Sequence, residues 1–218
     1  MNRKNTGIQV SDKALLFING NPPEILPNIE HYKLIACTDG AFHYLKKMGF
    51  SLDKLDFISG DFDSHHGFDE KIDHKKFIFT PDQNKTDFQK ALEIILEKGY
   101  KKVDVFGGSG GEQDHFLGNL TVAFRFKNDL EIKFFDENSV YYFIGRNYKI
   151  NDVKNKMMSL YPFPETKNVI TKGLNWNLSG ETLSVTTNIS TRNFANEDEV
   201  EIRFDDGEIL LFVGADYV

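Results

Sequence analysis

The sequence predicts a largely parallel, Rossmann-like α/β sheet domain followed by a small all-β sandwich domain. Apolar runs of strand length alternate with amphipathic helical segments up to about residue 138, a pattern typical of βαβ units. Beyond that point the runs are strand-like and no amphipathic helix of useful length lies between them. The chain of 218 residues is long enough to bury a core in each part. We therefore expect domains at residues 1–138 and 139–218.

The first domain is predicted to contain six strands and three helices. The strands are expected at residues 14–18, 33–38, 55–58, 77–80, 103–106 and 131–135. The helices are expected at residues 41–48, 88–98 and 115–126. Thr86, with Gln89 three residues later, has the pattern of a capping box at the start of the second helix.

The second domain is predicted from short β-forming runs. These lie at residues 140–144, 157–161, 169–171, 182–185, 200–204 and 209–212. Asp206-Gly207 is a favoured hairpin turn, so we expect the last two runs to pair with each other.

Composition limits the function classes. The net charge of −7 gives no reason to expect nucleic-acid binding, although it is compatible with a cationic small substrate. Cys37 is the single cysteine, which excludes an intrachain disulfide and is best interpreted as a core residue. No apolar stretch approaches the roughly 20 residues that span a bilayer, and residues 1–5 do not lead into a signal-peptide core. We expect a cytoplasmic protein.

Polar loops follow four of the predicted parallel strands. They contain Asp39-Gly40, then Asp61 and Asp63, then residues 83–87, then the glycine run 107–111. The carboxyl ends of parallel strands share one sheet edge, so these loops are expected to meet in space. Two converging carboxylates repel each other unless a cation lies between them, and oxygen ligands favour Mg²⁺. A polar turn is the simpler alternative for each loop taken alone.

Several further residues have two interpretations. The glycine run can bring backbone N–H groups to a phosphate or can be a surface turn; it is neither a Walker A loop nor a dinucleotide fingerprint. Asp114 is expected as the N-cap of the third helix, and His115 either contacts phosphate or packs. Trp176 is either a core residue or a platform on which a ring or a cation stacks. His65-His66 is interpreted as a solvated turn.

Four segments in order resemble motifs of the thiamin pyrophosphokinase family. They are Gly60-Asp61-Phe62-Asp63-Ser64; Pro81-Asp82-Gln83 through Thr86-Asp87-Phe88; Gly107-Gly108 through Gly111 with Asp114-His115; and Gly173-Leu174-Asn175-Trp176-Asn177-Leu178 followed by Ser190 and Asn193. The similarity covers nearly the whole chain.

The resemblance implies an enzyme that transfers the β,γ-diphosphate of ATP to the hydroxyl of thiamin, releasing AMP and thiamin diphosphate. It implies a homodimer, with thiamin between the α/β domain of one subunit and the β domain of its partner. Catalysis and Mg²⁺ binding would fall to Asp61, Asp63 and Asp87. The ATP side would comprise Asp39, Gly40, Gln83, Lys85, Thr86, Gly108, Ser109, Gly110, Gly111, Asp114 and His115. The thiamin side would comprise Gln83, Trp176, Ser190 and Asn193.

Two positions depart from the family pattern. Glu112-Gln113 stands where the family usually has an arginine, and Arg192-Asn193 replaces its Ser-Asn pair. Lys85 or Arg192 is a candidate to supply the missing cation. Two alternatives remain: a nucleotide- or thiamin-binding homologue without activity, and a metal-dependent phosphohydrolase with Asp61 as nucleophile, from whose pattern Ser64 departs.

Overall fold

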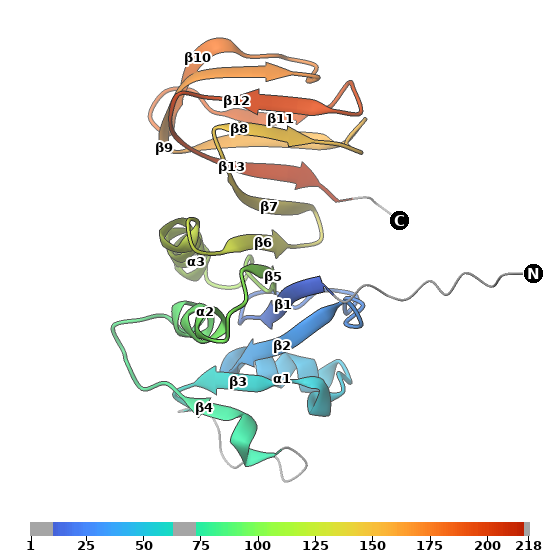
Figure 1. Ribbon diagram of the computed structural model, residues 1–218, viewed down its shortest axis with the longest axis vertical. Coiled ribbons are helices and arrows are strands. Elements are labelled where there is room, and N and C mark those ends of the chain that lie inside the picture. Colours follow the sequence, from blue (N-terminus) through green and yellow to red (C-terminus); the bar gives the residue numbers. More distant parts are fainter. Residues whose placement is uncertain (1–10, 63–72, 216–218) are drawn as a thin grey trace, which may run out of the picture. The chain divides into compact units, whose positions relative to one another are not determined.

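The computed structural model describes residues 11–62 and 73–215, which form two compact units, Met1–Ile132 and Lys133–Val218 (Figure 1). The units divide between Ile132 and Lys133, inside strand β6 (Glu131–Phe135), whereas the sequence pattern changes after residue 138. Asp63, Ser64, His65 and His66 lie outside the described residues. No helix in the described part of the chain is both long and apolar enough to cross a membrane.

The first unit contains a parallel sheet in the order β4-β3-β2-β1-β5, which confirms the predicted α/β class. Its strands are β1 (Ser11–Phe17), β2 (Tyr32–Thr38), β3 (Phe57–Gly60), β4 (Phe77–Phe79) and β5 (Lys102–Phe106). The strands β1 and β2 are continuous apolar runs because the centre of a parallel sheet is covered on both faces. Cys37 is fully buried in this core, as expected.

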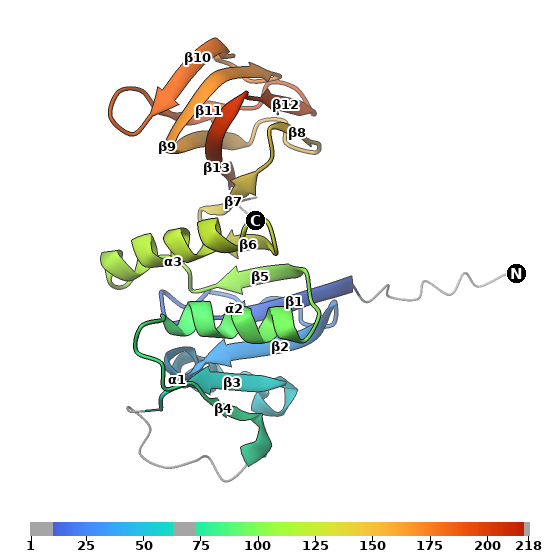
Figure 2. The same cartoon turned by 60° about the vertical axis from the view of Figure 1, so that its left-hand side comes forward.

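Three α-helices connect these strands: α1 (Asp39–Lys47), α2 (Asp87–Glu97) and α3 (Gln113–Phe126). Two short 3₁₀ helices, η1 (Leu52–Lys54) and η2 (His74–Lys76), precede β3 and β4. The helix α1 covers β2 and β3 from one face, and α2 and α3 cover the opposite face (Figures 1 and 2). The connections through α1 and α2 run in opposite directions along the sheet, so right-handed crossovers place these helices on opposite sides.

The N-cap residue predicted from the sequence is correct for α2 and wrong for α3. The Thr86 hydroxyl accepts a hydrogen bond from the Gln89 backbone N–H at 3.2 Å, which confirms the N-cap of α2. The Gln89 side chain bonds Glu93 instead of reaching back toward Thr86. The prediction that Asp114 caps α3 is wrong: Glu112 is the N-cap residue, and Asp114 lies in the first turn, where its carboxylate accepts from the His115 N–H at 2.9 Å.

The second unit is a β domain with its own core. Its strands are β7 (Ser139–Ile144), β8 (Asn147–Ile150), β9 (Met157–Lys172), β10 (Ser179–Ser184), β11 (Ser190–Phe194), β12 (Val200–Arg203) and β13 (Asp206–Gly214). The order β7-β13-β9-β12-β8 forms one path, while β10 and β11 also pair with β9. Inward-facing residues of these strands, among them Leu160, Val169 and Leu211, form one buried cluster. This confirms the predicted small all-β domain.

Strand β9 replaces two predicted strands, because residues 157–161 and 169–171 belong to one element of 16 residues. It pairs antiparallel with β13 and β12 along one edge and with β11 and β10 along the other. The short polar strands β8 and β11 were not predicted.

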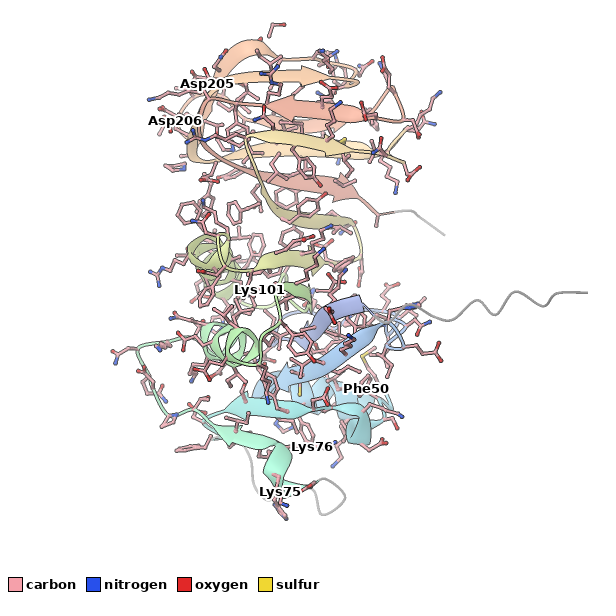
Figure 3. All side chains as sticks on the ribbon, in the orientation of Figure 1. Phe50, Lys75, Lys76, Lys101, Asp205 and Asp206 are labelled. Carbon is pink, nitrogen blue, oxygen red and sulfur yellow. The ribbon has the colours of Figure 1, made fainter. Side chains whose placement is uncertain are left out.

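The predicted hairpin at Asp206-Gly207 is wrong. Strands β12 and β13 run antiparallel to β9 one after the other along the same edge, so the chain does not turn back between them. Gly207 lies inside β13 at a register shift, with φ of +88°. A Cβ at Gly207 would lie 2.0 Å from the Glu165 carbonyl oxygen. The glycine therefore allows the backbone of β13 to approach β9 closely at this irregular point of the pairing. Asp205, which is labelled in Figure 3, also bonds β9: its carboxylate accepts a hydrogen bond from the Asn168 side-chain amide at 2.7 Å.

Candidate functional site

The first unit has a cavity of about 290 Å³ at the carboxyl edge of its sheet. Loops after β1, β2, β3 and β4 and the start of α3 line it, as expected for the ligand crevice of a parallel sheet. Its polar and charged lining residues are Asn19, Thr38, Asp39, Asp61, Gln83, Lys85, Thr86, Asp87, Lys90, Asp114, His115 and Asn119. The wall is therefore rich in carboxylates.

Asp39 is the most buried of these carboxylates, with an exposed fraction of 7%. It begins α1, and its two oxygens accept from the backbone N–H groups of Gly40 at 2.6 Å and Phe62 at 3.3 Å. Burial raises the pKa of Asp39, and the negative charges of Asp87 and Asp61 raise it further. Three carboxylates thus share one electrostatic environment that favours a cation.

Asp61 and Asp87 are each held by a neighbouring side chain. The Gln83 amide donates to the Asp61 carboxylate at 2.9 Å, which ties the loop after β4 to the loop after β3. The Lys90 ammonium lies 2.7 Å from the Asp87 carboxylate, one helical turn along α2. These contacts hold the two acidic groups at the cavity wall.

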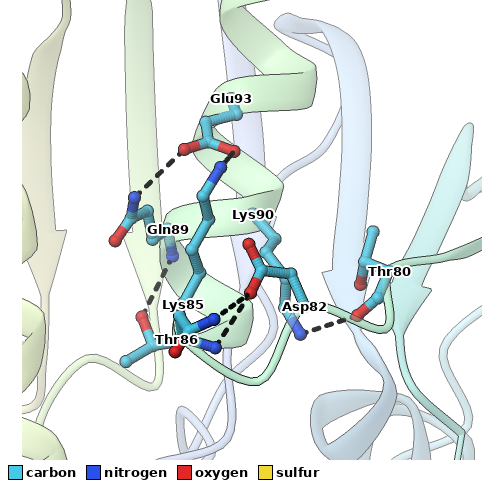
Figure 4. A network of polar contacts seen from close by, with 8 residues as sticks. Thr80, Asp82, Lys85, Thr86, Gln89, Lys90 and Glu93 are labelled. Atoms are coloured by element: carbon cyan, nitrogen blue, oxygen red, sulfur yellow. Dashed lines mark hydrogen bonds and ion pairs between the residues drawn. The ribbon is translucent and has the colours of Figure 1, made fainter.

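Lys85 belongs to a network of polar side chains at the start of α2 (Figure 4). Its ammonium lies 2.9 Å from Glu93, which also accepts from the Gln89 amide at 3.0 Å. Hydrogen bonding to Glu93 raises the pKa of Lys85, so the ion pair holds this lysine in its charged form. Lys85 therefore lines the cavity, but its ammonium is paired with the Glu93 carboxylate.

Glycines allow the loops of the site to pack against each other. A Cβ at Gly60 would lie 2.5 Å from Cγ of Asp39, and one at Gly110 would lie 2.2 Å from Cγ of Asn21. Gly110 has φ of +77°, a conformation that favours glycine. The Asn119 amide closes the glycine loop onto α3 by donating to the Gly108 carbonyl at 3.0 Å.

The structure brings most of the predicted ATP-side residues to the cavity. Asp39, Gln83, Lys85, Thr86, Gly110, Asp114 and His115 line it. Asp61 and Asp87, which were predicted as Mg²⁺ ligands, line it too. Gly40, Gly108, Ser109 and Gly111 lie within two residues of a lining residue in the sequence but are not lining residues themselves. Asp63 lies outside the described residues. Sequence reasoning missed Asn19, which follows β1 as the other acidic loops follow their strands, and Lys90, which is one turn beyond Asp87.

The start of α3 groups Asp114 and His115, which were predicted on the ATP side, with Glu112, which was not. The ligand atoms of Glu112, Asp114 and His115 lie within 4.8 Å of one another, and all three residues are exposed. Nε2 of His115 lies 3.5 Å from the Glu112 carboxylate. Exposed acidic groups of this kind are common at helix starts and do not define a second site.

The predicted thiamin-side residues of the second unit differ in exposure. Trp176 is 62% exposed, so its interpretation as a core residue is wrong. Asn193 is 3% exposed, and its amide bonds the backbone of Trp176. Ser190 lies in β11 opposite Leu160 of β9. The backbone of Trp176 is therefore hydrogen-bonded to a buried side chain, while its indole is exposed.

The second unit also has a cavity of about 770 Å³. Tyr161, Phe194 and Phe212 supply aromatic surface to it, and Lys154, Lys156 and Arg192 supply positive charge. Trp176, Ser190 and Asn193 are not among its lining residues.

Two family models match the chain in order. Residues 27–134 match the thiamin pyrophosphokinase catalytic domain, and residues 147–209 match the thiamin pyrophosphokinase vitamin B1 binding domain. The chain belongs to the thiamin pyrophosphokinase family. The first match covers most of the first unit and ends two residues beyond it, and the second lies within the second unit. Together they cover most of the sequence.

Relatives within the thiamin pyrophosphokinase family are distant in sequence. The chain is 28% identical over 165 residues to a thiamine pyrophosphokinase of Bacillus subtilis, covering 70% of this chain and 75% of that protein. It is 28% identical over 220 residues to thiamine pyrophosphokinase 1 of Oryza sativa, covering 88% and 83%. A solved thiamin pyrophosphokinase of Geobacillus thermodenitrificans has the same fold, with a TM-score of 0.77 at 20% identity, covering 93% of this chain and 98% of that chain.

Proposed function

We propose that this thiamin pyrophosphokinase family member transfers the β,γ-diphosphate of ATP to the hydroxyl of thiamin, giving thiamin diphosphate and AMP. The observation that carries the proposal is the ordered match of both family domains to a chain whose first unit has an acidic cavity at its sheet edge. An α/β unit with that cavity is suited to a nucleotide. The match to a vitamin B1 binding domain supports thiamin binding by the β domain.

The donor set suits Mg²⁺. Carboxylate oxygens are the ligands that this ion prefers. Burial is the main cause of the raised pKa of Asp39, and the negative charges of Asp87 and Asp61, which a cation would neutralise, add to it. Asp61 and Asp87, together with Asp63, are proposed to hold it. A bound Mg²⁺ would offset the charge of the phosphates during transfer.

The residues of the chain would act by positioning. Gln83 fixes Asp61, and Lys90 fixes Asp87. The glycine loop and the start of α3, with Asp114 and His115, would face the phosphates and the nucleotide. Phosphoryl transfer depends on alignment and charge stabilisation, so no covalent nucleophile is needed.

For the thiamin side we propose that Trp176 stacks on the vitamin and that Ser190 and Asn193 shape its pocket, with Gln83 contacting it from the α/β domain. We further propose a cytoplasmic homodimer in which thiamin lies between the α/β domain of one subunit and the β domain of its partner. Sedimentation of the purified protein tests the dimer: a monomer at assay concentration contradicts it.

The direct test is product analysis. The purified chain is incubated with ATP, Mg²⁺ and thiamin, and the nucleotide products are separated. Equal amounts of AMP and thiamin diphosphate support the proposal. ADP or free phosphate as the product contradicts it, and free phosphate points to the phosphohydrolase that uses Asp61.

One observation favours a second function, a binding homologue without turnover. The loop before α3 presents the exposed Glu112 carboxylate, so this position adds negative charge beside the proposed phosphate site. Tight binding of ATP and thiamin without AMP formation would support this alternative.

A further inference from the structure

The wall of the acidic cavity contains a buried lysine. The Lys90 side chain is 6% exposed and lines the cavity. Its ammonium donates to the Thr80 carbonyl oxygen at 2.8 Å (Figure 4). It also lies 2.7 Å from Oδ1 of Asp87. It is thereby fixed between the loop after β4 and the first turn of α2.

The other cationic side chains of this wall are placed differently. Lys85 is paired with Glu93, and its side chain is 37% exposed. His115 is exposed and lies near Glu112. Among the described lining residues, Lys90 is the one buried cation, facing a wall that contains Asp39, Asp61, Asp87 and Asp114.

A buried ammonium is costly to the fold. Removing such a charge from water costs several kcal/mol unless strong partners replace the water. Asp87 compensates only part of this cost, because its side chain is 38% exposed and solvent weakens the ion pair. The Thr80 carbonyl is a neutral acceptor. An ammonium has three donors, and the described residues provide these two acceptors, which leaves capacity for one more.

We propose that Lys90 is a phosphate-binding residue whose ammonium bridges Asp87 and an oxygen of the bound polyphosphate. The proposal rests on the proposed function, since it names the residue that supplies positive charge to that nucleotide site. In the absence of polyphosphate the ion pair with Asp87 keeps the ammonium at the cavity wall. A polyphosphate oxygen then completes its hydrogen bonding without a change of rotamer.

The test measures binding apart from turnover. Inorganic triphosphate is titrated calorimetrically into the wild type, Lys90→Gln, Lys90→Met and Lys90→Arg, with and without Mg²⁺. Loss of one charge-assisted hydrogen bond predicts at least about tenfold weaker binding for the Gln and Met variants. Lys90→Arg keeps the charge and should recover part of the affinity.

Lys102→Gln is the matched control, because Lys102 pairs with Glu131 at 3.4 Å on the surface and does not line the cavity. It should bind triphosphate as the wild type does. Thermal unfolding of every variant shows whether the fold is retained. A purely structural Lys90 would lower the melting temperature while leaving the affinity of the folded variant unchanged.

Wild-type affinity in a folded Lys90→Gln or Lys90→Met variant overturns the proposal, as does failure of both variants to fold. Failure of the proposed function has a different signature. In that case the wild type itself gives no AMP and thiamin diphosphate, whatever the triphosphate affinities of the variants.

Discussion

The side-chain amide of Asn193 is hydrogen-bonded to both backbone groups of Trp176. Its Oδ1 accepts from the Trp176 N–H at 3.1 Å, and its Nδ2 donates to the Trp176 carbonyl at 2.8 Å. The same Oδ1 also accepts from the Phe194 N–H at 2.9 Å. A buried amide thus fixes the main chain of a residue whose indole is exposed.

Replacement of Asn193 by alanine should loosen this segment. We expect Asn193→Ala to lower the free energy of unfolding by about 2 kcal/mol, because part-buried backbone groups of Trp176 and Phe194 lose their partners. The Michaelis constant for thiamin should rise, since Trp176 would lose its fixed position. Urea unfolding and steady-state kinetics measure both effects. Asn196→Ala, which removes an exposed bond to Asn175, is the control and should change little.

Replacement of the indole itself should separate binding from stability. Because Trp176 is 62% exposed, Trp176→Ala should change the free energy of unfolding by no more than about 0.5 kcal/mol. The Michaelis constant for thiamin should nevertheless increase more than that for ATP. An equal increase for both substrates would count against a thiamin-stacking role.

The acidic residues should be required for turnover and dispensable for folding. We expect Asp61→Asn and Asp63→Asn to abolish thiamin diphosphate formation, because each removes a charged ligand for Mg²⁺. Circular dichroism should show an unchanged fold. Asp53→Asn, at an exposed carboxylate bonded to Ser51, is the matched control. Near wild-type activity in Asp63→Asn would show that the metal site is assigned wrongly.

Asp39 should make stability depend on pH. Its pKa in the folded protein lies above the ordinary value of 3.8, chiefly because of burial, so the folded state holds this proton to a higher pH than the unfolded chain. The stabilisation linked to the protonated carboxyl is therefore present at low pH and is lost as pH rises from 3.8 through the folded pKa.

Urea unfolding between about pH 4 and pH 7 measures this dependence. The difference in unfolding free energy between the wild type and Asp39→Asn should shift against the wild type as pH rises. Added Mg²⁺ should reduce that shift, because a cation favours the charged carboxylate. A difference that does not vary with pH would contradict the assignment.

Local signals in the sequence were sufficient for the α/β unit. Apolar runs predicted its parallel strands, and Thr86 predicted the start of α2. Both features depend on residues that are close together in the sequence. The strand ends also predicted that Asp39, Asp61 and Asp87 line one crevice, since parallel strands share their carboxyl edge.

What the sequence did not predict depends on partners far along the chain. Lys90 has an unremarkable place in a helical pattern, and only the fold shows that its ammonium is buried beside Asp87 and Thr80. The Asp206-Gly207 pair has the local chemistry of a hairpin turn. Its role is set instead by close approach to Glu165 of β9, which no local pattern reveals.

Strand β9 has a consequence for the cooperativity of the β domain. Four strands, β10, β11, β12 and β13, take hydrogen bonds from this one segment, so none of them can detach without exposing part of it. Its amides are therefore expected to exchange with solvent deuterium only when the whole domain opens. Among these partners β13 comes last in the sequence. During synthesis, folding of the domain is therefore expected to be complete only after residues 206–214 have left the ribosome.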